Sequence, residues 1–369
     1  MKSRLLLAPI AMIAALASAY AQEVPVGVLS AQSGSTAFSG VPMANGIHLA
    51  VDEANQKNYL GTAKVKLIDG DYASDKAQAI SLANQFAKRD KVVLAFGPLN
   101  TPDTLAVAPV FNENKTPIIA LATSDRVLET GPYTFKLEVT PAELLVAVAK
   151  YVVEKTPIRK VAVVYQTTND AQLEMKDVFV QNLKAGGGTV VSDDGLSPNE
   201  SNFLPLVTKI VSEDVEGVFI ILNAEQAANL MVQLRQGGLP ASVPFIGSTS
   251  VVSPRMLAIA GRAAEGTIAQ AEFISGQERN KEFETAYKAR FGIEADAYAG
   301  LGYTIGLIGL QAIKGAGPNP TPEKVREALM AVGQVAVPAG GGTWSHVNRR
   351  PVYESVIVQV KGGKFVPVP

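Results

Sequence analysis

The chain has 369 residues, of which 47% are hydrophobic and 18% charged, and none is cysteine. Its 33 basic and 34 acidic residues nearly balance and form no polybasic or polyacidic run, which argues against nucleic acid or an anionic membrane surface as a partner. Without disulfides the fold must rely on hydrophobic cores, and a chain of this length is long enough to build two.

The first 21 residues have the features of a secretory signal peptide. Lys2 and Arg4 precede an apolar run over residues 5–16, and the sequence AYA at 19–21 places small residues where a signal peptidase cleaves. The run is too short to cross a bilayer core of about 30 Å. We therefore predict cleavage before Gln22, a periplasmic location, and no insertion of the mature chain into the membrane.

Further along the chain, apolar runs typical of strands alternate with helical segments in two similar sets. The predicted strands cover residues 24–29, 64–69, 92–97, 117–121 and 133–138, and then 160–165, 189–194, 217–222, 243–247 and 266–273. Such alternation predicts parallel sheets with helices on both faces. Because the two sets match in order and spacing, we predict an α/β protein with two doubly wound lobes.

After residue 273 the pattern changes to three helices, at 281–292, 297–313 and 321–332, followed by a strand pair near the C-terminus. These elements are accommodated if the chain recrosses between the lobes, which gives a multi-strand hinge that permits closure. The predicted division is 22–139 plus 272–342 for lobe 1, and 140–271 plus 343–369 for lobe 2.

Polar loops follow the carboxyl ends of the predicted strands, where doubly wound sheets bind their ligands. They lie at residues 30–40, 70–75, 98–103, 122–125, 166–170, 223–226 and 248–250. Their Ser, Thr, Asn, Gln and Asp residues can cap helices, and helix N-termini that face a cleft can also hold an anion. The sequence leaves both roles open for each residue.

The first of these loops, SAQSGSTAFSG, has the layout of a phosphate cradle but lacks a nucleotide motif, since no Lys-Ser/Thr pair follows its glycines. There is no G-x-S-x-G, no H-E-x-x-H and no metal-ligand spacing, and the only histidines are His48 and His346. Asp69 and Asp71 could form an acid pair, but no base or nucleophile accompanies them. We expect a protein that is not an enzyme and has no cofactor and no metal.

Three stretches carry a resemblance to a known family: VGVLSAQSGSTAFSG…NGIHLAVDEAN, GDYASDKAQAISLANQFAKRDKVVLAFGP and AGRAAEGTIAQAEF. They resemble the periplasmic solute-binding proteins of ABC importers, and more narrowly the branched-chain amino-acid-binding (leucine/isoleucine/valine-binding protein-like) family. The resemblance covers the whole mature chain. It implies the type I periplasmic binding protein fold, a monomer, a small-molecule solute and the membrane permease of an ABC importer as partner.

In this family the first lobe holds the carboxylate of the solute with hydroxyls and backbone N–H groups. The resemblance places this role on Asn100 and Thr101 after the third strand, and on Ala122 and Thr123 after the fourth. Small or hydroxylated residues let an anion approach the helix ends without a basic side chain. A carboxylate-bearing solute is therefore expected.

The family pairs the ammonium of an amino acid with an acidic residue of the second lobe, and this sequence has Thr249 at that position. A desolvated ammonium without a carboxylate partner costs several kcal/mol. Either the solute has no ammonium or Asp170 supplies the charge, although Asp170 is equally well explained as the N-cap of the helix that follows it.

The shape of the expected cleft also departs from the family. Ser39 stands where some relatives place a large aromatic residue, with Phe38 beside it, and Asn223 replaces a second-lobe aromatic residue. Ser33 of the first loop completes the expected wall, and Tyr298 either lines the cleft or packs within its helix. A roomier cleft with Phe38 able to stack on a ring favours an aromatic acid, then an atypical amino acid, over a standard branched-chain amino acid.

Other classes of function remain as alternatives. A sensor that presents its solute to a membrane receptor has the same sequence features, and neighbouring permease or kinase genes would separate the two. An exported hydrolase or amidase lacks a nucleophile and a base here. A cytoplasmic repressor is disfavoured by the signal peptide and by the absence of an N-terminal helix-turn-helix.

Overall fold

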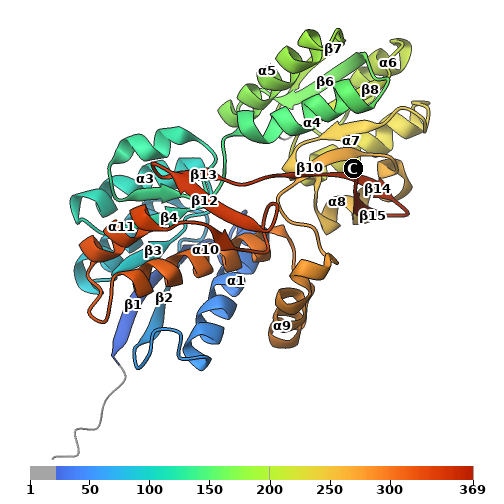
Figure 1. Ribbon diagram of the computed structural model, residues 1–369. Helices are drawn as coiled ribbons and strands as arrows, with labels where there is room; N and C mark the ends of the chain where they lie inside the picture. The colour runs from blue at the N-terminus through green and yellow to red at the C-terminus, as the bar shows by residue number, and fades with distance from the viewer. Residues whose placement is uncertain (1–21, 199, 369) are drawn as a thin grey trace, which may run out of the picture.

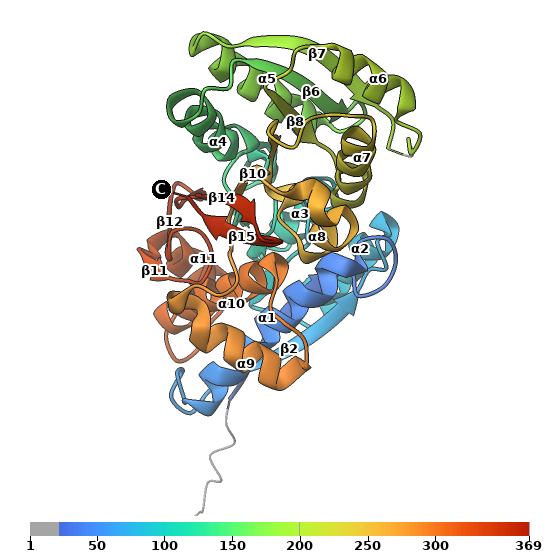
Figure 2. The ribbon, with the colours of Figure 1, turned by 90° about the vertical axis from the view of Figure 1, so that its right-hand side faces the viewer.

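The computed structural model describes residues 22–198 and 200–368, which form two α/β lobes (Figures 1 and 2). The predicted signal peptide, residues 1–21, lies outside the described residues. Within the described part of the chain, no helix has both the length and the apolar character that a bilayer crossing requires.

The first lobe is built on a parallel sheet in the order β2-β1-β3-β4-β5, and the predicted strands of the first set are confirmed. The strands are β1 (Glu23–Ser30), β2 (Lys64–Asp71), β3 (Leu94–Phe96), β4 (Ile118–Ala120) and β5 (Thr134–Lys136). The helices are α1 (Ala37–Gln56), α2 (Lys76–Asn84), α3 (Thr101–Glu113), α9 (Lys281–Phe291), α10 (Ala297–Gly315) and α11 (Pro322–Ala331).

The second lobe has a sheet in the order β15-β14-β10-β9-β8-β6-β7, in which β6 to β10 are parallel and β14 and β15 form an antiparallel hairpin. Its strands are β6 (Lys160–Gln166), β7 (Thr189–Leu196), β8 (Gly217–Ile221), β9 (Phe245–Gly247), β10 (Ile268–Ala271), β14 (Val356–Lys361) and β15 (Lys364–Pro367). Its helices are α4 (Pro141–Lys155), α5 (Asp170–Ala185), α6 (Leu204–Ser212), α7 (Ala224–Gln236) and α8 (Pro254–Ala260). Two doubly wound lobes, as predicted, are confirmed.

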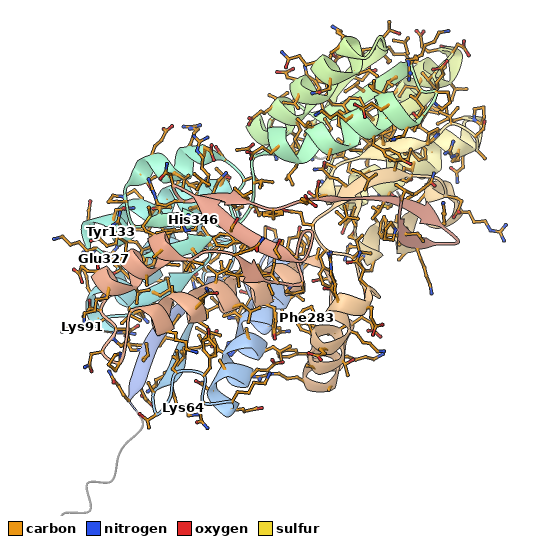
Figure 3. The ribbon with its side chains drawn as sticks, in the orientation of Figure 1. Lys64, Lys91, Tyr133, Phe283, Glu327 and His346 are labelled. Carbon is orange, nitrogen blue, oxygen red and sulfur yellow. The ribbon has the colours of Figure 1, made fainter. Side chains whose placement is uncertain are left out.

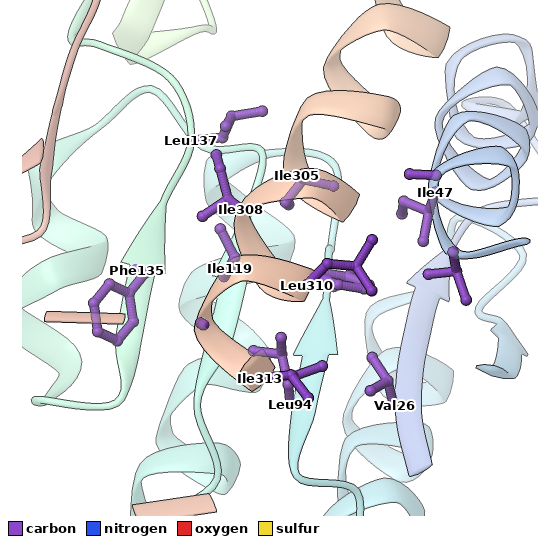
Figure 4. Close-up of a cluster of buried hydrophobic side chains, with 14 of the residues drawn as sticks. Val26, Ile47, Leu94, Ile119, Phe135, Leu137, Ile305, Ile308, Leu310 and Ile313 are labelled. Carbon is purple, nitrogen blue, oxygen red and sulfur yellow. The ribbon is translucent and has the colours of Figure 1, made fainter. Parts of the chain in front are cut away.

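The core of the first lobe lies between its sheet and the pair α1 and α10. Figure 4 shows side chains of α10 packed against buried residues of the strands and of α1. The two helices approach so closely that a Cβ on Gly302 would lie 2.1 Å from the Met43 carbonyl oxygen, and one on Gly46 2.2 Å from that of Ala299. The glycine-rich stretch 299–313 is therefore a buried helix in contact with α1.

Helix α9 packs on the same lobe. The ring of Phe283 on α9 lies 4.7 Å from the ring of Tyr303 on α10 (Figure 3), and Phe283 is buried.

His48 and His346 are both structural: His48 Nε2 lies 2.9 Å from Asp69 Oδ1, and His346 Nε2 hydrogen-bonds the Leu329 carbonyl at 2.7 Å.

Between residues 22 and 368 the chain passes between the lobes three times: after β5, after β10 and before β14. A small sheet of β11 (Val335–Ala336), β12 (Thr343–Val347) and β13 (Arg350–Val352) precedes the third crossing. Trp344 Nε1 of β12 donates to the Leu137 carbonyl at 3.1 Å, and Arg349 donates to the Thr134 carbonyl at 2.9 Å. Residues 343–352 thus pack on lobe 1, whereas the sequence division assigned them to lobe 2. We propose that the final boundary follows Val352.

Candidate functional site

A cavity of about 830 Å³ opens between the carboxyl-terminal ends of the strands of the two lobes. Loops after β3, β4, β5 and β6 line it. Its wall consists of Lys76, Leu99, Asn100, Thr101, Pro102, Leu105, Leu121, Thr123, Ser124, Arg126, Glu138, Gln166, Thr168, Asn169 and Glu174. A smaller cavity of about 520 Å³ lies at the opposite end of the second sheet, around Ile158 and Gly266, and is lined by the second lobe alone. Only the larger one joins residues of both lobes, so it is the site that lobe closure would change.

Helix α3 begins at the first-lobe wall of this cavity. Asn100 caps the helix, since its Oδ1 accepts a hydrogen bond from Asp103 N at 2.8 Å, while its Nδ2 donates to Asp103 Oδ2 at 2.8 Å. The Asn100 side chain is therefore committed to capping. Thr101 Oγ1 accepts from Ser124 N at 3.3 Å, which leaves the hydroxyl proton available to donate into the cavity.

A buried lysine that the sequence analysis did not identify lies behind the neighbouring loop. The Lys136 side chain is 1% exposed, and its Nζ donates to the Thr123 carbonyl at 2.8 Å and pairs with Asp125 Oδ1 at 2.6 Å. Arg350 binds the other Asp125 oxygen at 3.1 Å. Lys136 thus fixes the Thr123 loop, and together with Arg350 it more than neutralises the Asp125 carboxylate behind this wall. Ala122, in the same loop, is buried and does not line the cavity.

The second-lobe wall is formed by the loop between β6 and α5. Asn169 is the N-cap of α5, with Oδ1 accepting from Gln172 N at 3.3 Å, and Gln166 donates to Gln226 Oε1 at 3.0 Å. Asp170 is the first residue of α5, so it is not the N-cap; its side chain is outside what the structure describes. Glu174, on the next turn, is exposed at the cavity wall.

Two glutamates lie where the chain crosses between the lobes. Glu138 follows β5 and lines the cavity, and Glu272 follows β10 and is 6% exposed. Burial raises the pKa of Glu138 to about 7, although Lys136 opposes this shift; burial and the nearby Glu138 both raise the pKa of Glu272. Tyr353, at the third crossing, donates a hydrogen bond to Glu272 Oε1. All three crossings therefore meet around this carboxyl pair.

Tyr298 and Phe38 lie beside each other at the first-lobe end of these crossings. Their rings are 6.1 Å apart and nearly perpendicular, and Phe38 is 61% exposed. Burial, followed by the charges of Glu138, Asp296 and Glu272, raises the pKa of the Tyr298 hydroxyl, so this phenol stays neutral. Neither ring is among the residues that line the cavity.

The opening loop is hydrogen-bonded to Asp71, the last residue of β2. Ser33 Oγ donates to Asp71 Oδ2 at 2.7 Å and Gln32 N donates to Asp71 Oδ1 at 2.8 Å. Burial raises the pKa of Asp71, but the hydrogen bonds from Ser33 and from neighbouring backbone N–H groups outweigh it, and the pKa is lowered. Ser39 is 1% exposed, and its hydroxyl donates to the Thr36 carbonyl at 2.9 Å.

The remaining expected residues lie at two other strand ends of the second lobe. Asn223 is the N-cap of α7, with Oδ1 accepting from Gln226 N at 2.9 Å. Thr249 is half-buried in a short 3₁₀ turn after β9. Of the residues expected from the sequence, the structure brings Asn100, Thr101 and Thr123 together in the cavity, and places Asn223 and Thr249 outside its lining.

Lys136, Glu138 and Glu272 could have been found from the sequence by one signal. All three are charged residues in or directly after runs predicted as buried strands, 133–138 and 266–273, and charged side chains are rarely buried unless they are paired. Among residues 22–198 and 200–368, no group of three or more acidic or histidine side chains is arranged to hold a metal ion.

Comparisons with known proteins agree with this architecture. The family model described as "Periplasmic binding protein" matches residues 23–364. The Leu/Ile/Val-binding protein homolog 1 of Brucella melitensis biotype 1 is 29% identical over 328 residues, which cover 88% of this chain and 86% of that protein.

Two solved structures superpose closely. The branched-chain amino acid transporter substrate binding protein LivJ from Streptococcus pneumoniae, in complex with isoleucine, has a TM-score of 0.82 at 20% identity, covering 94% of this chain and all of that chain (100%). A solute binding protein of an ABC transporter from Rhodopseudomonas palustris BisB5, in complex with 3,4-dihydroxybenzoic acid, has a TM-score of 0.82 at 24% identity. The match covers 94% of this chain and 96% of that chain. The predicted type I periplasmic binding protein fold is confirmed.

Proposed function

The chain belongs to the periplasmic binding protein family, in the group of the Leu/Ile/Val-binding proteins, and on this premise we propose that it captures a small carboxylate-bearing solute between its lobes. Members of this group bind small solutes for ABC importers. In our proposal this chain carries its solute to a membrane permease in the periplasm, after loss of residues 1–21 as a signal peptide, and it acts as a monomer without catalysing a reaction.

The observation that carries the proposal is the chemistry of the first-lobe wall. Thr101, the first residue of α3, has a hydroxyl proton to donate, Thr123 lies in the next loop, and the buried Lys136 of β5 donates to the Thr123 carbonyl. Hydroxyl donors, a helix N-terminus and a desolvated cation together favour a carboxylate over a neutral group. The isoleucine and the 3,4-dihydroxybenzoic acid bound by the two structural relatives both carry a carboxylate.

Binding and release need no covalent step. The solute first binds the Thr101 and Thr123 wall of the open form, and rotation about the three crossings then brings Thr168 and Asn169 of the second lobe onto it. The contacts made only in the closed form determine how far the solute shifts the open–closed equilibrium. The permease then recognises the closed form.

An aromatic acid or an atypical amino acid is the favoured solute. Thr249 provides no carboxylate at the end of β9, and the exposed ring of Phe38 lies outside the cavity lining, from which in our proposal closure brings it toward a bound ring. A standard branched-chain amino acid is the alternative. A role as a ligand-presenting sensor would use the same site and differs only in the membrane partner.

The test is a thermal-shift screen of the purified mature protein against amino acids, aromatic acids and short dicarboxylates. A solute at 100 times its Kd should add about 2.7 kcal/mol of stability. The variant Thr101→Ala/Thr123→Ala should lose this stabilisation while its unliganded melting temperature stays close to that of the native chain, and the exposed Thr62→Ala serves as control. Unchanged affinity in the double variant would show that this wall does not bind the carboxylate of the solute.

A further inference from the structure

We propose that Arg126 and Lys76 bind a second carboxylate of the solute, so that the solute is a dicarboxylic acid rather than an acid with a single negative charge. This inference rests on the proposed function, because it places a second anion in the same cavity. It assigns a specificity-determining role to two basic residues that the sequence analysis did not identify.

Both basic residues lie on the first-lobe wall of the cavity. Lys76 is the first residue of α2, and Arg126 is the second residue of the turn Asp125–Thr130, which follows β4. Arg126 comes three residues after Thr123, so one loop carries a proposed contact to the first carboxylate and a guanidinium. Both basic side chains are exposed, and closure of the second lobe over a bound solute would withdraw them from water.

Arg126 has no counter-charge among the described side chains. Its neighbour Asp125 is bound by Lys136 at 2.6 Å and by Arg350 at 3.1 Å, so two other cations already share this carboxylate. A guanidinium offers parallel N–H donors that match the two oxygens of a carboxylate. Arg126 is therefore the main contact for the second acid group.

Lys76 stands where a basic residue does not favour its own helix. It is at the N-terminus of α2, whose first turn holds no acidic residue, and a cation there faces the positive end of the helix dipole. The preceding residue, Asp75, caps the helix by accepting from Gln78 N at 2.8 Å. No ion pair of the described residues involves Lys76. A bound carboxylate would satisfy both this ammonium and the helix end.

The acids that line the cavity do not cancel these two charges. Burial raises the pKa of Glu138 to about 7, so near neutral pH this carboxyl carries only part of a negative charge. Glu174 is exposed on α5 and is the one described acid of the second lobe in the lining. Because closure moves it toward the first-lobe wall, Glu174 is the competitor of the solute for these cations.

The experiment compares acids that share a carbon skeleton and differ in one carboxylate, by titration calorimetry at pH 7. Suitable pairs are pentanoate with glutarate, 4-methylbenzoate with terephthalate, and norvaline with glutamate. In the native protein, the member with the additional carboxylate should bind about tenfold or more tightly than its partner in at least one pair.

Substitutions then locate the second anion. Arg126→Gln should weaken the acid with the additional carboxylate by about tenfold or more, and Lys76→Gln by about threefold or more, while its partner stays within about twofold. Lys88→Gln is the matched control, because it removes the same charge from an exposed first-lobe residue outside the cavity lining, and it should change neither affinity.

Two substitutions on α5 test whether these cations pair with the second lobe instead. Glu174→Gln and Asp170→Asn each remove an acidic group of this helix. If Arg126 and Lys76 bind the solute, both variants should keep the preference for the additional carboxylate. If the cations served to hold the closed form through these acids, either variant would weaken both members of a pair as much as Arg126→Gln does.

The outcomes separate this inference from the proposed function. It is overturned if every singly charged acid binds the native protein as tightly as its partner, if Arg126→Gln weakens both members equally, or if an α5 variant reproduces the effect of Arg126→Gln. In each of these cases the proposed function stands, provided that Thr101→Ala/Thr123→Ala loses every acid. If that double variant binds normally, or if no acid binds the native protein, the proposed function fails and the inference fails with it.

Discussion

Replacing Lys136 by methionine tests whether the buried cation stabilises the Thr123 loop. Methionine keeps most of the length of the lysine stem and removes the ammonium that donates to the Thr123 carbonyl and pairs with Asp125. The substitution leaves the carbonyl without its donor and leaves Asp125 with Arg350 alone.

The magnitude follows from the burial of each partner. Breaking a buried ion pair by removing one partner costs about 3–5 kcal/mol. Lys136 is 1% exposed, but Asp125 is 25% exposed and keeps its contact with Arg350, so water and a second cation offset part of the loss. We expect the free energy of unfolding to fall by about 2–3 kcal/mol, which for a urea slope near 2 kcal/mol/M lowers the midpoint by about 1–1.5 M.

The assay is urea unfolding of native protein and variants without solute, followed by the thermal shift with the best solute of the screen. Lys66→Met is the matched control, since Lys66 also lies on a strand of the first lobe and pairs with Glu23 at 2.7 Å, but with both side chains more than half exposed. Its loss should cost less than about 1 kcal/mol. Solute binding should weaken in Lys136→Met and not in Lys66→Met.

Equal effects of the two substitutions on the urea midpoint would refute the reasoning, because burial is the property that separates the two ion pairs. A stable Lys136→Met protein with unchanged solute affinity would likewise show that the cation contributes nothing to the first-lobe wall.

Three further predictions concern packing, pH and an optical signal. Gly302→Ala should lower the free energy of unfolding by about 1–3 kcal/mol, because its Cβ would lie 2.1 Å from a backbone oxygen of the facing helix, whereas Gly333→Ala, with no atom within 4 Å of the new Cβ, should change it little. Glu138 should make the unliganded protein less stable as pH rises from about 4.5 to about 7, because it keeps its proton in the folded chain after the unfolded chain has lost it, and Glu272, whose pKa is also raised by burial, should act in the same direction. Glu138→Gln and Glu272→Gln should each flatten this slope in pH-dependent melting curves, and an unchanged slope would contradict the pairing. Trp344, the single tryptophan, is 4% exposed, so its emission should move to longer wavelength in step with urea unfolding of the first lobe, and an emission already typical of water in the native protein would contradict its burial.

The fold could be predicted from the sequence because its strands are nearly continuous apolar runs separated by helix-capping residues. Val161 to Val164 in β6 and Val218 to Ile221 in β8 are fully buried, which is the pattern of strands covered on both faces. The end of the first lobe could not be placed in this way. The segment 343–352 mixes polar and apolar residues without a regular period, and its contacts, such as Trp344 Nε1 with the Leu137 carbonyl, show that it packs on the first lobe.

Part of the site was predicted because its residues follow strands that can be recognised in the sequence. Thr101 and Thr123 directly follow recognisable strands, and parallel strands bring their carboxyl ends to one edge. Polar residues that cap their own helices, such as Asn100 and Asn223, have the same sequence signature as binding residues, so the sequence could not separate the two roles. The sequence marks Glu138 as a charge within an apolar run, but the groups that surround it come from three crossings that are far apart in the chain.

The crystal structure of the complex with the acid that gives the largest thermal shift tests the central claim most directly. The account predicts closed lobes, with the carboxylate of the solute within hydrogen-bond distance of Thr101 Oγ1 and of the Thr123 loop, in the cavity of about 830 Å³. A carboxylate bound by the second lobe, or a solute outside this cavity, would contradict it.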